Sequence, residues 1–116
     1  MKDGKFEYFS DDEIQGLMND LVYKLDRARE YFGAPIIITS GYRDPLQNAK
    51  AGGVKDSAHE HGMAVDIRCA DQEMQKKLIW ALACAGFKRC GAYDKHVHVD
   101  IDSSKPTPAF WTGTSH

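Results

Sequence analysis

Two short segments rich in histidine and aspartate constrain this chain more than any other feature. Residues 57–66 read Ser-Ala-His-Glu-His-Gly-Met-Ala-Val-Asp, and residues 96–100 read His-Val-His-Val-Asp. A catalytic zinc usually takes three protein ligands from His, Asp or Glu and leaves a fourth position for water. The two segments therefore predict a zinc site with His59, Asp66 and His98 as its ligands.

The residues between the first two ligands indicate how those ligands would be placed. Gly62 permits a turn after His59. Residues 64–67, Ala-Val-Asp-Ile, have the alternating apolar pattern of a strand that leaves this turn. One ligand is therefore expected on a loop and the next on the strand into which the loop leads.

Length and composition predict one globular domain over residues 1–116, because a chain of 116 residues can form one core but not two. The hydrophobic content of 42% and the charged content of 28% are ordinary for such a domain. The net charge is -2, and the Lys and Arg residues are scattered rather than gathered into a basic stripe. No apolar run approaches the roughly 20 residues of a membrane helix. We therefore expect a monomer with no nucleic-acid partner and no membrane span.

The N-terminal segment and the cysteines bear on the compartment of the protein. Residues 1–5 lack the apolar core of a secretory signal. The three cysteines, Cys69, Cys84 and Cys90, cannot form a complete set of disulfides, and no Cys-x-x-Cys spacing points to a cysteine zinc site. We expect all three to be reduced and buried, with Cys84 on a helix face.

Hydrophobic periodicity and turn residues predict an α+β fold with a small, mainly antiparallel sheet and flanking helices. The first helix is expected to begin at a capping box made by Ser10 and Glu13. Phe110 and Trp111 in the tail are expected to fold back onto the core rather than to line a substrate groove. The predicted elements are a helix over residues 10–33, a strand over 35–39, a helical turn over 46–51, a strand over 64–69, a helix over 71–86, and strands over 87–93 and 96–101.

The motif Ser-x-His-x-x-Gly-x-Ala-x-Asp with a downstream His-x-His resembles the zinc peptidases of the D-alanyl-D-alanine carboxypeptidase family, the M15 group. Its relatives include phage L-alanyl-D-glutamate endolysins, vancomycin-resistance D,D-dipeptidases and the signalling domain of Hedgehog proteins. Three more segments match in order: residues 38–43 (Ile-Thr-Ser-Gly-Tyr-Arg), the loop from Asn48 to Gly53, and Gly91-x-Tyr93. The resemblance implies a Hedgehog/D,D-peptidase-like fold, a Zn²⁺ cofactor and cleavage of peptidoglycan stem peptides, of D,D-carboxypeptidase or L,D-endopeptidase type.

The resemblance also implies roles for three further residues. Arg43 resembles the family's arginine that holds substrate or the developing oxyanion, a task suited to a planar cation with several donors. Ser57 resembles a residue that hydrogen-bonds the peptide near the metal, although it could equally cap a turn. His96 lies two residues before His98, so both side chains share one face of a strand. By resemblance His96 would stabilise the transition state or shuttle a proton; a fourth ligand in a closed structural site is the alternative reading.

The general base is the position at which this chain departs from the family pattern. Many members carry an acid three residues before the last ligand, where this chain has Lys95. The neighbouring Asp94 is the first candidate for the base. Asp100 is the second, and it could instead orient a ligand imidazole from outside the metal's own ligand set.

The expected setting follows from the implied substrate, because peptidoglycan lies outside the cytoplasmic membrane. The absence of a signal favours a phage endolysin or a virion lysis component that acts on the cell wall. A non-catalytic zinc-bearing binding module of the same fold is the main alternative, and the displaced acid at residues 94–95 keeps it open. The acidic charge balance disfavours a metal-dependent nuclease, and a structural zinc fold would need four ligands.

Overall fold

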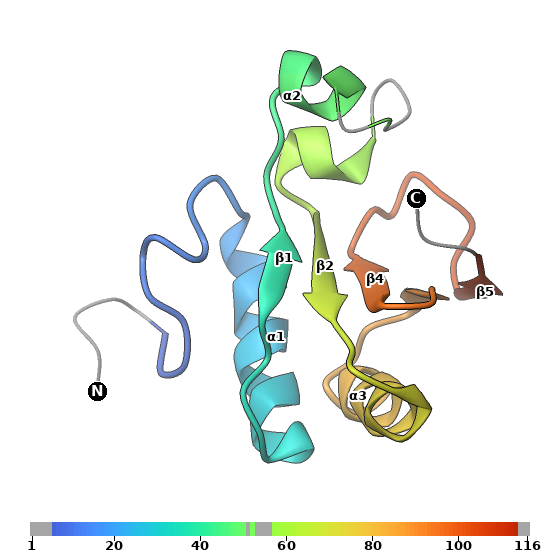
Figure 1. The fold of residues 1–116 in the computed structure, drawn as a ribbon. Helices are drawn as coiled ribbons and strands as arrows, with labels where there is room; N and C mark the ends of the chain where they lie inside the picture. The colour runs from blue at the N-terminus through green and yellow to red at the C-terminus, as the bar shows by residue number, and fades with distance from the viewer. Residues whose placement is uncertain (1–5, 51, 53–56, 114–116) are drawn as a thin grey trace.

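The computed structural model of the chain describes residues 6–50, 52 and 57–113. Its elements, in chain order, are α1 (Asn19–Phe32), β1 (Ile38–Ser40), α2 (Pro45–Lys50), the 3-10 helix η1 (Ala58–His61), β2 (Ala64–Arg68), α3 (Gln72–Cys84), β3 (Arg89–Ala92), β4 (His96–Asp100) and β5 (Ala109–Thr112). Three α-helices in this part of the chain accompany one five-stranded sheet (Figure 1). The predicted α+β class is confirmed.

The sheet has the strand order β1-β2-β4-β3-β5. Every neighbouring pair is antiparallel except β3 and β5, which run parallel. The predicted strand pair over residues 87–101 is the β3–β4 hairpin, and the predicted helical turn is α2. The first strand is shorter than expected, because its ladder begins at Ile38 rather than at Pro35.

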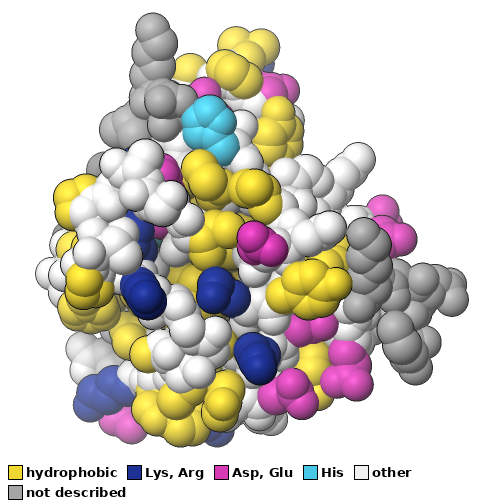
Figure 2. Space-filling model, turned by 180° about the vertical axis from the view of Figure 1, so that it is seen from behind, with side chains coloured by type: hydrophobic (Ala, Val, Ile, Leu, Met, Phe, Trp, Pro, Cys, Tyr) yellow, Lys and Arg dark blue, Asp and Glu magenta, His cyan; other side chains and the backbone are white. Residues whose placement is uncertain are grey.

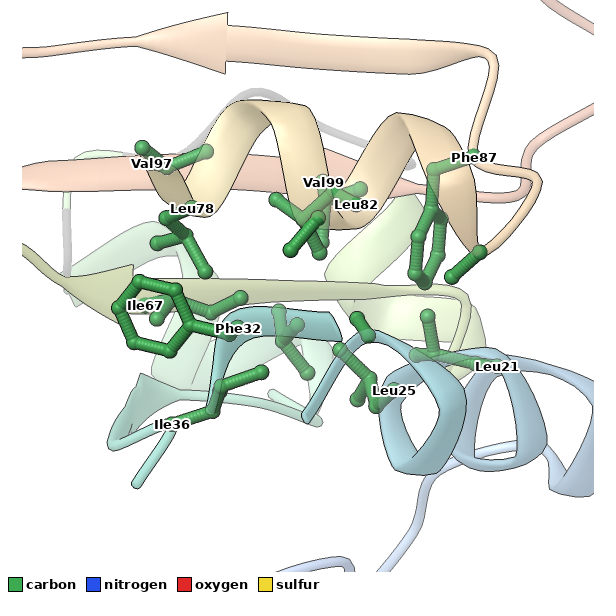
Figure 3. Close-up of a cluster of buried hydrophobic side chains, with 14 of the residues drawn as sticks. Leu21, Leu25, Phe32, Ile36, Ile67, Leu78, Leu82, Phe87, Val97 and Val99 are labelled. Carbon is green, nitrogen blue, oxygen red and sulfur yellow. The ribbon is translucent and has the colours of Figure 1, made fainter. Parts of the chain in front are cut away.

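The hydrophobic core lies between one face of the sheet and the helices α1 and α3 (Figure 3). Alternate residues of β2 and β4 point into it and are fully buried, and they meet leucines from both helices. These residues are Val65, Ile67, Val97, Val99, Leu21, Leu25, Leu78 and Leu82. Each such side chain contributes roughly 1.5–3 kcal/mol of transfer free energy. Since side chains alternate between the two faces of a strand, the polar residues of β2 and β4 lie on the opposite face.

The N-terminal helix begins later than the sequence predicts. The capping box does form, since the amide of Ser10 donates to Glu13 Oε1 over 2.8 Å and the amide of Glu13 donates to Ser10 Oγ over 3.3 Å. Residues 11–16 nevertheless form turns rather than a helix, and α1 starts at Asn19. The prediction that the helix starts at Ser10 is therefore wrong.

A tertiary contact explains the late start of α1. Gly16 has a φ of 81°, in the left-handed region, which interrupts any helix between the capping box and α1. The amide of Met18 then donates to the carbonyl of Gly62 over 2.9 Å instead of to a helical partner. The segment before α1 is thus fastened to the loop after η1, and this bond outweighs local helix propensity.

Two predictions about individual side chains need correction. Cys69 and Cys90 are buried and free, as expected, but Cys84 is exposed because it lies on the solvent side at the end of α3. The aromatic tail does not enter the core. Phe110 and Trp111 lie in β5, where Phe110 is 59% exposed and Trp111 is half-buried on the face of the sheet away from α1 and α3.

The surface carries charges of both signs. On the face seen in Figure 2, Lys and Arg side chains are interspersed with acidic and hydrophobic ones. Within the described residues, every helix is too short or too polar to cross a bilayer.

Candidate metal centre

The three predicted ligands lie together on the sheet face opposite the helices. His59 comes from η1, Asp66 from β2 and His98 from β4. Asp66 Oδ1 lies 3.5 Å from His59 Nε2 and 3.1 Å from His98 Nδ1. One ligand atom from each residue can be chosen so that all three lie within 4.8 Å of one another. Segments far apart in the sequence thus form one compact group.

The loop after β1 fixes the ring of His59. Its Nδ1 lies 2.8 Å from the carbonyl oxygen of Gly41. Because a carbonyl only accepts, Nδ1 donates to Gly41 and Nε2 is the nitrogen that faces Asp66. The amide of Arg43 donates to the carbonyl of His59 over 3.0 Å, which ties the same loop to η1. His59 is 4% exposed.

His98 is held from the opposite side by a buried carboxylate. Asp66 and His98 are direct partners in the β2–β4 ladder, which explains their close approach. His98 Nε2 lies 2.8 Å from Asp100 Oδ2. The other oxygen of Asp100 accepts from Arg89 Nε over 2.7 Å and from the amide of Asp102 over 3.1 Å. Both oxygens of Asp100 are therefore engaged, which supports its role in orienting His98 over a role as general base.

The pKa values of the group follow from these bonds. Burial disfavours the charged form of Asp66, but its hydrogen bonds to His59 and His98 outweigh burial and hold the pKa of Asp66 well below its ordinary value. Burial likewise disfavours protonation of His98. The bonds from His98 to Asp100 and Asp66 outweigh that effect and raise the pKa of His98.

His96 lies on the same face of β4 as His98, whereas Asp94 lies in the turn before it. His96 is half-buried on the same face of β4 as His98, and its ring stacks on that of Tyr93 with centroids 4.6 Å apart and planes 5° apart. Asp94 is exposed in the turn between β3 and β4. Among the described residues, the candidate metal group comprises His59, Asp66 and His98 without it.

The two predicted substrate-binding residues differ in their surroundings. Arg43 follows β1 and is half-buried, and its Nε atom has no hydrogen-bond partner among the described residues. Ser57 is 7% exposed, and its hydroxyl donates to Asn48 Oδ1 over 3.3 Å. Asn48 in turn donates to Glu60 Oε2 over 2.7 Å. Ser57 therefore joins α2 to η1, while Arg43 keeps a donor uncommitted.

All the site residues predicted from the sequence lie within residues 4–102, the segment that matches the family described as Peptidase M15. The chain belongs to the peptidase M15 family. Comparison with curated proteins gives no match. Membership of the M15 family indicates a zinc-dependent peptidase, and the His59–Asp66–His98 group could hold its metal ion.

The donor set suits the zinc of an M15 peptidase. Two neutral imidazole nitrogens and one carboxylate oxygen form a ligand set found in catalytic zinc sites. With bonds of about 2.0–2.1 Å, neighbouring ligands of a tetrahedral zinc lie about 3.3–3.4 Å apart. The separations of 3.5 Å and 3.1 Å from Asp66 Oδ1 are close to that value. His59 and His98 would bind through different nitrogens, Nε2 and Nδ1.

Two residues beside this site, Arg89 and Trp111, were not predicted from the sequence. Arg89 is 9% exposed and holds Asp100, but a single arginine in a strand gives no sequence signal of burial. Trp111 lies with its ring centroid 5.7 Å from that of His98. Its signal was the pair of aromatic residues in an otherwise polar tail, which was assigned to the core instead of the site.

Proposed function

We propose that this M15 family member cleaves the stem peptides of bacterial peptidoglycan, as a D,D-carboxypeptidase or an L,D-endopeptidase. The observation that carries the proposal is the His59–Asp66–His98 group in a chain of this family. Because the substrate lies in the cell wall, the proposed setting is the wall, and the proposed biological role is that of a phage endolysin or a virion lysis component.

His59, Asp66 and His98 would hold the metal. When bound, zinc would polarise the scissile carbonyl and make a water molecule nucleophilic near neutral pH. Asp66 supplies the negative charge of the ligand set, and Asp100 keeps the ring of His98 oriented through Nε2. The pairing of β2 with β4 keeps the two ligands of the sheet at a fixed separation.

The proton transfers and substrate contacts are assigned to residues beside the ligands. His96 shares the face of His98 and is the proposed group that moves a proton or stabilises the transition state. Arg43, a half-buried cation in the loop after β1, is proposed to bind a substrate carboxylate or the developing oxyanion through its guanidinium. Asp94 stays a candidate base by way of its turn. Ser57 stays a candidate peptide contact, because its hydroxyl donates to Asn48 and its oxygen can still accept a hydrogen bond.

A non-catalytic binding module is the second candidate, and one observation favours it. Asp94 is exposed in its turn and Asp100 is committed to His98 and Arg89. Neither acid therefore stands ready as a base, so the fold could bind zinc and a wall peptide without hydrolysis.

Digestion of purified peptidoglycan by the zinc-loaded protein, with mass spectrometry of the released fragments, separates the two candidates. Hydrolysis releases D-alanine or cut stem peptides and identifies the bond. His98→Ala should abolish release, and comparison of His96→Gln with Asp94→Asn identifies the proton-transfer group. A folded protein that binds zinc stoichiometrically and releases nothing contradicts the peptidase and supports the binding module.

A further inference from the structure

Strand β5 brings Trp111 into the same cross-strand row as two of the metal-binding candidates. Trp111 is opposite Gly91 in the β3–β5 ladder, Gly91 is opposite His98 in the β3–β4 ladder, and His98 is opposite Asp66. Directly opposed residues share one face of a sheet, so Trp111 lies on the site face. The segment matched by the family ends at residue 102, so β5 (Ala109–Thr112) lies outside it.

The absence of a side chain at Gly91 makes room for two aromatic rings. A Cβ atom at Gly91 would lie 2.6 Å from Trp111 Cε2 and 2.9 Å from Tyr93 Cε2. The indole and the phenol therefore occupy the space above Gly91, beside His98. A Cβ atom at Gly113 would likewise lie 2.6 Å from Tyr93 Cε1. Two glycines thus allow the rings to pack tightly against the strands.

Trp111 fixes the hydroxyl group of Tyr93. Trp111 Nε1 donates to the Tyr93 hydroxyl over 2.9 Å. An indole N–H is only a donor, so the phenol oxygen accepts and keeps its own proton to donate. No acceptor for that proton is found among residues 6–50, 52 and 57–113. The stacked ring of His96 restrains the phenol from its other side.

Trp111 also covers the ion pair that orients His98. The guanidinium carbon of Arg89 lies 5.0 Å from the centroid of the Trp111 ring, within the range of a cation–π contact. Arg89 in turn holds Asp100, which bonds His98. Trp111 of β5 therefore contacts both the Tyr93 hydroxyl and Arg89, which supports His98 through Asp100.

We infer that Tyr93 contacts the substrate and that Trp111 is its positioning residue. The indole N–H holds the phenol so that the Tyr93 O–H donates to a carbonyl or carboxylate oxygen of the peptide beside His98. The inference rests on the proposed function, because it names a further contact of the same peptidase site. By this inference β5 contributes a positioning residue to the proposed peptidase site.

The test compares Tyr93→Phe, Trp111→Phe and the double variant in hydrolysis of the peptidoglycan stem pentapeptide by zinc-loaded protein. Each single change should lower kcat/KM about tenfold or more, as expected for loss of an oriented donor. The double variant should be no slower than either single variant, since both remove the same hydrogen bond. Zinc stoichiometry should not change. Phe110→Leu, at an exposed neighbour in β5, is the control and should match the wild type.

Intrinsic fluorescence gives a second readout that does not depend on hydrolysis. The chain has two tryptophans, and Trp80 lies on α3, 54% exposed. In the Trp80→Phe variant, emission comes from Trp111 alone, and the stem pentapeptide should shift or quench it. In the Trp111→Phe variant, where only Trp80 emits, the same titration should give no change.

The outcomes separate the inference from the proposed function. If the wild type hydrolyses the peptide but Trp111→Phe is fully active, or the two losses add, the inference is wrong and the function stands. If the peptide binds without hydrolysis, the function is wrong. The inference then stands only if Tyr93→Phe and Trp111→Phe each weaken peptide binding and the double variant binds no more weakly than the single ones. If the peptide neither binds nor is cut, both are wrong.

Discussion

At the scale of single residues, the site depends on how each imidazole is held by its second nitrogen. His59 is oriented by a backbone carbonyl, through Gly41, and His98 by a buried carboxylate, Asp100. The two rings therefore offer different nitrogens to the same oxygen of Asp66. Residues outside the ligand set thus decide which atoms can bind a metal.

The first prediction concerns Asp100. Asp100→Asn should weaken zinc affinity about 10- to 100-fold, because His98 loses the charged partner that orients its ring and raises its basicity. Calorimetric titration of metal-free protein with Zn²⁺ measures the change. Asp102→Asn is the matched control, because Asp102 is also buried but bonds Ser104 and Lys105 rather than His98. Equal losses in the two variants would contradict the orienting role.

The sequence could predict the candidate ligands but not their supports. His59, Asp66 and His98 stood out because histidines and an aspartate recur within short motifs. Their supports come from the β1–α2 loop and from the first residue of β3, where a backbone carbonyl and a lone arginine carry no distinguishing pattern. The role of Asp100 stayed open for the same reason, since only the fold shows that Arg89 and His98 occupy both of its oxygens.

At the scale of elements, η1 is the piece that presents His59, and it is held from two sides. The loop after β1 bonds it through Gly41 and Arg43. The segment before α1 bonds the following loop through Met18 and Gly62. A short 3-10 helix has little stability of its own, so these tertiary bonds keep the ligand in place.

The second prediction tests this attachment. Gly62 has a φ of 69°, and a Cβ there would overlap the carbonyl oxygen of Gly16. Gly62→Ala should therefore cost about 1–3 kcal/mol of unfolding free energy, measured by urea denaturation, and should also weaken zinc binding. Gly33→Ala is the control, because Gly33 has a φ of 73° but open space around it, so it should cost only about 1–2 kcal/mol and leave zinc binding unchanged.

The starts and ends of elements show why sequence patterns were insufficient here. The apolar repeat before α1 is real, but Gly16 and the bond from Met18 to Gly62 make that stretch a series of turns. Strand β5 was missed because its four residues carry no alternation, and it is stabilised by parallel pairing with β3. The late start of α1 and the formation of β5 both depend on contacts with distant segments. Local periodicity carries no information about such contacts.

At the scale of the whole molecule, the two faces of the sheet have different roles. Apolar residues alternate with polar ones along β2 and β4. One face of the sheet therefore forms the core with α1 and α3 (Figure 3), and the other face carries the site. The class of fold followed from this alternation, whereas the strand order β1-β2-β4-β3-β5 did not, because it joins non-consecutive strands. Two of the three candidate ligands, Asp66 and His98, therefore lie on the sheet itself.

The third prediction concerns the cysteines and reports on the packing of the whole domain. Burial raises the pKa of Cys69 to about 11 and that of Cys90 to about 12, so neither forms an appreciable amount of thiolate at pH 8. Iodoacetamide at that pH should rapidly modify only the exposed Cys84 in native protein and all three cysteines in denaturant. Rapid labelling of Cys69 or Cys90 in native protein would show that the core is looser than described.

The measurement that tests the central claim most directly is zinc binding by metal-free protein and its His59→Ala and His61→Ala variants. The two histidines share η1, but His59 is buried in the candidate group and His61 is exposed outside it. We predict one Zn²⁺ bound per chain by the wild type and by His61→Ala, and loss of tight binding in His59→Ala. Unchanged binding by His59→Ala, or an equal loss in His61→Ala, would contradict the metal centre on which the proposed peptidase rests.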